Sequence, residues 1–296
     1  MKKILGYVKN YFLDIDRNIF LISVIFTSLA IFVNYYGQLN SRIGALGETA
    51  RYGSWFVVFF VGFSFAYWLL IPYKKRNLFK NVRFVLLLLI APLLFAWKMA
   101  FDPEFQLSHD SLENAYWNRV VYYPFKLTVM TACLLIIWKI FDRDQPFYGW
   151  GLKGFEIRPY LWMLLFMVPL VAAASTQHDF LEVYPKLKNV LFLSGEQNNG
   201  WYKLLYELSY GSDFIGIELF FRGFLVLAFV KWAGRDTILP MAIFYCTIHF
   251  GKPLGECISS FFGGLILGIV TYHTRTILGG LIVHLGIAWL WNWEDI

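Results

Sequence analysis

Charged residues are scarce in this chain, and their scarcity limits the kind of protein it can be. They make up 16% of its 296 residues, whereas an ordinary soluble domain has roughly 25%. Hydrophobic residues make up 58% and aromatic residues 20%, with a mean hydropathy of +0.53. These values exclude a disordered chain and argue against a water-soluble globule, whose surface needs more charge. The composition instead indicates an integral membrane protein.

Cysteine is scarce as well. The three cysteines, Cys133, Cys246 and Cys257, have no Cys-x-x-Cys spacing and lie in apolar surroundings. This pattern supports neither a disulfide framework nor a thiolate metal site. We expect the cysteines to serve as packing residues.

Basic residues outnumber acidic ones, 26 against 20, for a net charge of +6. They do not form the single stripe that is typical of a nucleic-acid-binding surface. Instead they collect in short segments between apolar runs, such as Lys74 to Arg83, where they are typical of anchors that face the cytoplasm and anionic lipid. We therefore expect membrane lipid as a partner and no nucleic acid.

Nine apolar segments come close to the length of about 20 residues that a helix needs to cross a bilayer. They are Ile19–Tyr36, Ser54–Pro72, Arg83–Phe101, Val120–Phe141, Tyr160–Gln177, Phe214–Lys231, Thr237–Phe250, Glu256–His273 and Thr276–Trp293. We predict an all-α fold, a polytopic transmembrane helix bundle of about eight or nine spans. Residues 1–148 form an N-terminal group of spans without a functional signature, and residues 149–296 form a C-terminal domain. Within this C-terminal domain, Trp201–Tyr210 is predicted to be an interfacial helix.

An ionisable side chain inside a span is costly and must have a partner, a cavity or a function. Lys98 and Lys126 lie near span ends, so we expect them to extend to the interface. Glu218 and Arg222 differ, because they are four residues apart and share one helix face within an apolar span. They form either a structural ion pair or part of a functional site.

Two histidines lie in the same group of helices as this pair. His249 ends the seventh predicted span, and His284 lies within the ninth. Small residues at close spacing, namely Gly264, Gly268, Gly279, Gly280 and Gly286, allow the backbones of these helices to approach one another. We therefore expect Glu218, His249 and His284 to lie near each other. In a dry cavity, a carboxylate can take a proton from water while an imidazole donates to a developing oxyanion.

These residues resemble the motifs of the CAAX-protease and bacteriocin-processing (CPBP or Abi) family of intramembrane endopeptidases. The family pattern is Glu-Glu-x-x-x-Arg, then Phe-x-x-x-His, then His-x-x-x-Asn or a similar residue. The corresponding blocks here are Ile217 to Gly223, Tyr245 to His249 and His284 to Ala288. The segment Gly149-Trp150-Gly151-Leu152 is similar to the usual beginning of the family's domain. The resemblance implies a CPBP-type core in the C-terminal half.

The chain departs from the family pattern at two positions. The family's first glutamate, to which water activation is assigned, corresponds to Ile217, and the asparagine that helps to hold the oxyanion corresponds to Ala288. Glu218, Arg222, His249 and His284 match their counterparts. The signatures His-Glu-x-x-His, Gly-x-Gly-Asp and Gly-x-Ser-x-Gly of other intramembrane proteases are absent from the sequence.

Three interpretations of the site remain. In the favoured one, the protein is a glutamate-type peptidase in a bacterial plasma membrane, and it cleaves a membrane-associated substrate, prenylated or bearing a leader. Glu218 activates water, with Glu256 as an alternative, while Arg222, His249 and His284 assist. In the second, Glu218, His249 and His284 bind a divalent metal such as zinc, although we favour the absence of a cofactor. In the third, the bundle is a non-catalytic immunity, scaffold or transport protein.

Overall fold

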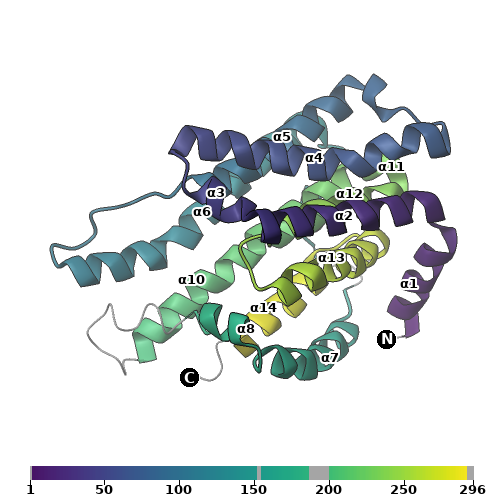
Figure 1. Cartoon of the computed structure of the whole chain (residues 1–296). Coiled ribbons are helices and arrows are strands. Elements are labelled where there is room, and N and C mark those ends of the chain that lie inside the picture. Colours follow the sequence, from purple (N-terminus) through teal and green to yellow (C-terminus); the bar gives the residue numbers. More distant parts are fainter. Residues whose placement is uncertain (1, 152–154, 187–199, 292–296) are drawn as a thin grey trace.

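The computed structural model describes residues 2–151, 155–186 and 200–291, and every regular element within these ranges is a helix (Figure 1). The all-α prediction is therefore confirmed for the described chain. Leu152 of the predicted domain-start motif and the last two residues of the ninth predicted span lie outside the described residues.

The N-terminal part of the chain forms long helices with short connections. Polar side chains begin three of them: Asp16 accepts hydrogen bonds from the backbone at the start of α2, and Asn81 and Asp110 do so for α5 and α6. The helices are α1 (Lys2–Asp14), α2 (Arg17–Gly37), α3 (Leu39–Gly44), α4 (Glu48–Lys74), the 3₁₀ turn η1 (Leu78–Lys80), α5 (Val82–Ala100) and α6 (Ser111–Phe141).

The C-terminal part consists of shorter and less regular helices. They are the turn η2 (Phe147–Gly149), α7 (Arg158–Ala174), α8 (His178–Val183), α10 (Gly200–Glu218), the π-helix η4 (Leu219–Ala228), α11 (Val230–Ala233), the turn η5 (Gly234–Thr237), α12 (Ile238–Thr247), α13 (Leu254–Thr274) and α14 (Leu278–Trp291). The predicted interfacial helix Trp201–Tyr210 is instead the first half of α10. Because Tyr206, Ser209 and Tyr210 are buried and α10 packs along α6, this half belongs to the bundle.

Five of the described helices are long and apolar enough to cross a membrane, namely α2, α4, α5, α6 and α13. Two shorter apolar helices, α7 and α14, accompany them. Large apolar side chains on the outside, such as Phe32 of α2 and Phe166 of α7, are about 60% exposed, which suits a lipid-facing surface. The chain is an integral membrane protein.

Two predicted spans differ from the structure. Phe214–Lys231 is divided among α10, η4 and α11, and Thr237–Phe250 contains only the ten residues of α12. At 1.5 Å per residue, a ten-residue helix covers about 15 Å, half of the hydrocarbon thickness. All ten residues of α12 and all ten of η4 are buried. Apart from Arg222, η4 is apolar, and α12 is apolar as well, because both elements form the centre of the bundle.

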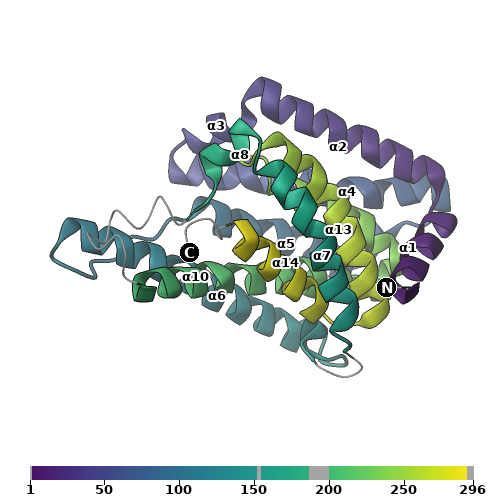
Figure 2. The ribbon, with the colours of Figure 1, turned by 90° about the horizontal axis from the view of Figure 1, so that it is seen from below.

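The helices before and after residue 149 share one hydrophobic core. Phe244 of α12 lies against Phe59 and Phe63 of α4, with ring centroids 5.0 and 5.6 Å apart. Seen from below, α14 lies along α7 and α10 (Figure 2). The predicted close approach at small residues is confirmed at Gly264, which lies against Tyr245, and at Gly286, which lies against Leu164.

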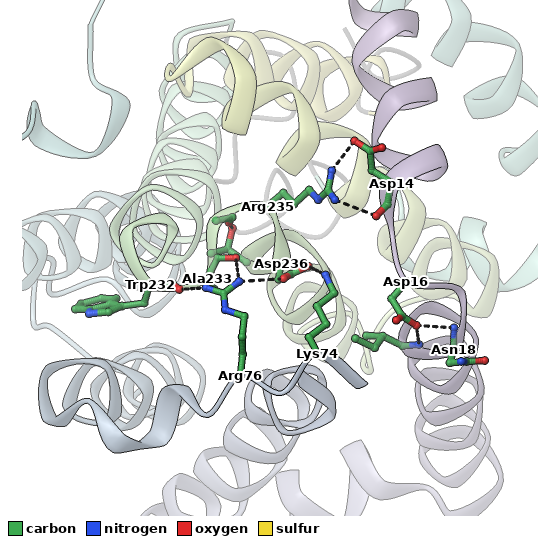
Figure 3. Close-up of polar contacts among 12 residues, drawn as sticks. Asp14, Asp16, Asn18, Lys74, Arg76, Trp232, Ala233, Arg235 and Asp236 are labelled. Carbon is green, nitrogen blue, oxygen red and sulfur yellow. Dashed lines mark hydrogen bonds and ion pairs between the residues drawn. The ribbon is translucent and has the colours of Figure 1, made fainter. Parts of the chain in front are cut away.

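A cluster of ion pairs joins the two parts of the chain at one end of the bundle (Figure 3). Lys74 at the end of α4 lies 2.5 Å from Asp236 of η5, and Arg235 lies 2.5 Å from Asp14 at the end of α1. Arg76 also contacts Asp236 and donates a hydrogen bond to the carbonyl oxygen of Trp232. The basic segment at the end of α4, which the sequence suggests is a membrane anchor, therefore also makes ion pairs and hydrogen bonds within the protein.

The π-helix η4 passes very close to the η2 turn. A Cβ atom on Gly223 would lie 2.7 Å from the carbonyl oxygen of Tyr148, and Gly149 has a φ of +75°, which favours glycine. Tyr148 cannot move away easily, because it is buried and its hydroxyl donates to Asp142 at 2.8 Å. Only glycine fits at position 223.

We predict that Gly223→Ala lowers the free energy of unfolding by about 1–3 kcal/mol, because the new methyl group collides with backbone. The measurement is the thermal unfolding midpoint of detergent-purified protein. Gly263→Ala is the matched control, since a Cβ atom there meets nothing within 4 Å. Equal midpoints for the two variants would contradict the packing described.

Candidate functional site

Glu218 and Arg222 form a fully buried ion pair at the junction of α10 and η4. Nη1 of Arg222 lies 3.2 Å from Oε1 of Glu218, and both side chains have an exposed fraction of 0%. Nδ1 of His284 on α14 lies 2.6 Å from the same oxygen. Neither contact has the alignment of a hydrogen bond, so the attraction between the Glu218 carboxylate and the Arg222 guanidinium is electrostatic. The predicted approach of Glu218 and His284 is present in the structure.

A glycine on α14 makes room for this contact between α14 and α10. A Cβ atom on Gly280 would overlap the carboxylate of Glu218. Gly280 lies one turn before His284 on the same helix. The absence of a side chain at position 280 therefore allows the carboxylate to reach the imidazole.

Tyr245 on α12 connects the ion pair with both histidines. Its hydroxyl oxygen lies 2.7 Å from Nε2 of His284, and the guanidinium carbon of Arg222 lies 4.2 Å from its ring centroid. Sequence reasoning did not single out Tyr245 as a site residue. The signal was present, because Tyr245 occupies the position of phenylalanine in the family's second motif and adds a hydroxyl group there.

His249 is held by the backbone just beyond the end of α12. Its Nδ1 lies 2.8 Å from the carbonyl oxygen of Tyr245. Because a carbonyl oxygen can only accept, Nδ1 carries the hydrogen and the neutral ring keeps its lone pair on Nε2. His249 can therefore act as a proton acceptor.

A cavity of about 370 Å³ lies between the two parts of the chain, and His249, His284, Tyr245 and Glu256 are among the residues that line it. Helices α5 and α6 supply part of its wall. Glu218 and Arg222 are not among the residues that line it. The lining residues are Phe95, Lys98, Met99, Asp102, Arg119, Tyr122, Tyr123, Lys126, Tyr184, Lys186, Tyr210, Asp213, Phe214, Ile217, Tyr245, Ile248, His249, Lys252, Glu256, His284, Ile287 and Ala288.

Glu256 is the carboxylate that α13 contributes to the cavity wall. It lies in the first turn of α13, and its side chain is 10% exposed. The hydroxyl of Tyr184 donates to its carboxylate at 3.1 Å, and Nζ of Lys252 lies 3.9 Å from Oε1. A partly buried carboxylate with few polar partners can accept a proton from water.

Both departures from the family pattern lie on the cavity wall. Ile217 and Ala288 line the cavity, so the first-motif glutamate and the third-motif asparagine are replaced by apolar side chains at the surface where they would meet a substrate. Among the described lining residues none is serine, threonine or cysteine. The wall described therefore offers carboxylate, imidazole and phenol groups, but no hydroxyl or thiol nucleophile of the usual protease types.

The predicted positions of Lys98 and Lys126 are wrong. Both side chains point inward and line the cavity instead of extending to the interface. Lys98 lies 2.7 Å from Asp213 of α10, and Lys126 is 1% exposed. Each lysine finds partners in the bundle, so neither needs to extend to the interface.

The metal interpretation does not fit the described side chains. Within the described ranges no group of three or more His, Cys, Asp or Glu residues is arranged to hold a metal ion. Oε1 of Glu218 and Nδ1 of His284 lie 2.6 Å apart, which leaves no room for an ion between these two atoms.

Residues 208–290 match the family model of the type II CAAX prenyl endopeptidase Rce1-like proteins. The resemblance to the CPBP family is confirmed. This match contains Glu218, Arg222, His249, Glu256 and His284. Comparison with curated proteins and with solved structures gives no match. The match, together with the apolar helices, supports a membrane environment for the chain.

A double-variant cycle measures the interaction free energy between Glu218 and Arg222. We predict that Glu218→Gln and Arg222→Met each destabilise the protein by about 3–5 kcal/mol, because each leaves one buried charge without its partner. The double variant should lose less than the sum. Thermal unfolding midpoints in detergent measure all three, and strictly additive losses would show that the two side chains do not interact.

Proposed function

We propose that this protein is a membrane-embedded endopeptidase of a bacterial plasma membrane that hydrolyses a peptide bond of a membrane-associated substrate, prenylated or bearing a leader. The observation that carries the proposal is the cavity lined by His249, His284 and Glu256 together. All three lie within the residues that match the CAAX endopeptidase model.

In this proposal Glu256, with His249, activates the water molecule. The carboxylate of Glu256 faces the cavity, and Nε2 of His249 keeps its lone pair. Glu218, which the sequence favours for water activation, has no exposed surface and does not line the cavity. We therefore assign Glu218 a positioning role, in which it holds His284 while Arg222 balances its charge.

The reaction begins when the water oxygen attacks the carbonyl carbon of the substrate and its proton passes to Glu256 or His249. The carbonyl becomes an oxyanion, which needs a hydrogen-bond donor. When both ring nitrogens of His284 carry a proton, Nδ1 faces the carboxylate of Glu218 and Nε2 donates to the oxygen of Tyr245, which leaves the phenol hydrogen for the oxyanion. The carbon–nitrogen bond then breaks, and the leaving nitrogen takes the proton from Glu256 or His249.

A non-catalytic bundle is the second candidate, and a specific observation supports it. Ile217 and Ala288 make the cavity wall apolar at the two positions where the family pattern has polar side chains. A protein of this kind would bind a membrane-associated partner in the cavity without cleaving it. Its role would then be in immunity, as a scaffold or in transport, as in the third interpretation of the sequence.

We predict that detergent-purified protein cleaves members of a library of membrane-tethered peptides and that a chelator does not stop the reaction. Glu256→Gln should lower the cleavage rate by about 10²–10⁴-fold, the usual contribution of a general base. Glu218→Gln should cause a smaller loss, because it acts through His284. Mass spectrometry of the peptides measures each rate.

The matched control is Glu182→Gln, which changes a carboxylate that is 67% exposed on α8. It should cleave as the unchanged protein does. Cleavage of no peptide by folded protein would support the non-catalytic candidate. If Glu218→Gln protein shown to be folded loses more activity than Glu256→Gln, water activation returns to Glu218. Inhibition by the chelator would favour a metal.

A further inference from the structure

Lys126 is a buried cation in the cavity wall without an acidic partner in direct contact among the described residues. Its Nζ donates hydrogen bonds to the carbonyl oxygen of Lys98, at 2.8 Å, and to the hydroxyl of Tyr122. It also lies 3.9 Å from the ring centroid of Tyr122. Within the described residues no carboxylate oxygen lies within 4.0 Å of it, and Asp213, the carboxylate that α10 contributes to the wall, pairs with Lys98. The groups that touch this ammonium group are neutral.

The described residues that line the cavity include more basic than acidic side chains. The basic lining residues are Lys98, Arg119, Lys126, Lys186 and Lys252, and the acidic ones are Asp102, Asp213 and Glu256. A buried charge is costly unless a group of opposite charge lies beside it. The surplus of cations therefore favours an anionic group as the occupant of this part of the cavity.

The cationic wall lies close to the histidines along α10. Asp213, which holds Lys98, is one helical turn before Ile217, about 6 Å along the helix axis. Phe214, which follows Asp213, has its ring centroid 5.7 Å from that of His284. An extended peptide covers about 3.5 Å per residue, so one chain could reach both places within a few residues.

We propose that Lys126, with Lys98 beside it, binds a carboxylate of the peptide substrate. The proposal rests on the proposed peptidase function and gives the helices α5 and α6 a part in substrate recognition. The carboxylate belongs either to a free C-terminus or to an aspartate or glutamate side chain of the substrate. Both sources offer the same chemistry, an anionic oxygen pair that accepts hydrogen bonds from ammonium groups.

The test compares a cleaved library peptide with two neutral counterparts, one with an amidated C-terminus and one with Asp and Glu changed to Asn and Gln. We predict that one of the two changes raises KM at least tenfold with little change in kcat, and that change identifies the source of the carboxylate. Lys126→Met should remove the difference between the peptides. Lys139→Met, which changes an exposed lysine of the same helix, should keep it.

Binding without cleavage separates this proposal from the peptidase function. Fluorescence anisotropy of the labelled peptides is measured on Glu256→Gln protein, with and without Lys126→Met. A carboxylate preference that Lys126→Met removes would support the subsite even if no peptide is cleaved. Cleavage or binding with no carboxylate preference, or with a preference that survives Lys126→Met, would overturn it.

The stability of Lys126→Met excludes an effect of misfolding. Since the variant removes a buried charge that touches no acidic group, its thermal unfolding midpoint should equal or exceed that of the unchanged protein. A midpoint lower by several degrees, together with lost binding of both charged and neutral peptides, would show that Lys126 serves the fold and would overturn the proposal.

Discussion

Glu218 and Arg222 form an ion pair one helical turn apart, with no exposed surface, in the middle of an apolar helix bundle. Neither charge is stable there alone, because the free-energy cost of removing one ion from water far exceeds the stabilisation that nearby dipoles provide. Their pairing keeps the junction of α10 and η4 in one arrangement. It also creates the negative oxygen that lies against His284, so the orientation of the imidazole at the cavity depends on the pair.

The cavity exists because the two parts of the chain pack as one body. Phe244 of α12 lies against α4, Lys98 of α5 lies against Asp213 of α10, and the ion pairs at Asp236 join α4 to η5. The residues that match the family model therefore supply the histidines and Glu256, while helices before residue 149 supply the cationic wall. The N-terminal spans, which have no functional signature in the sequence, complete the cavity.

The sequence predicts well those features that depend on local spacing. The four-residue separation of Glu218 and Arg222 places them on one face, and Gly280 allows α14 to approach. It does not reveal which neighbour faces the cavity, since successive residues on a helix point about 100° apart. Thus Ile217 lines the cavity and Glu218 does not. Nor does it distinguish a lysine that extends to the interface from one that turns inward, as Lys126 does.

The central claim is that water attacks the substrate directly in a cavity whose described wall has carboxylate and imidazole groups but no serine, threonine or cysteine. The most direct measurement is a single-turnover cleavage in water enriched in ¹⁸O, followed by mass spectrometry of product and protein. The account predicts one ¹⁸O atom in the new carboxyl terminus of the peptide and no mass added to the protein at any time. A protein species that carries an acyl fragment of the substrate, formed and consumed during the turnover, would contradict it.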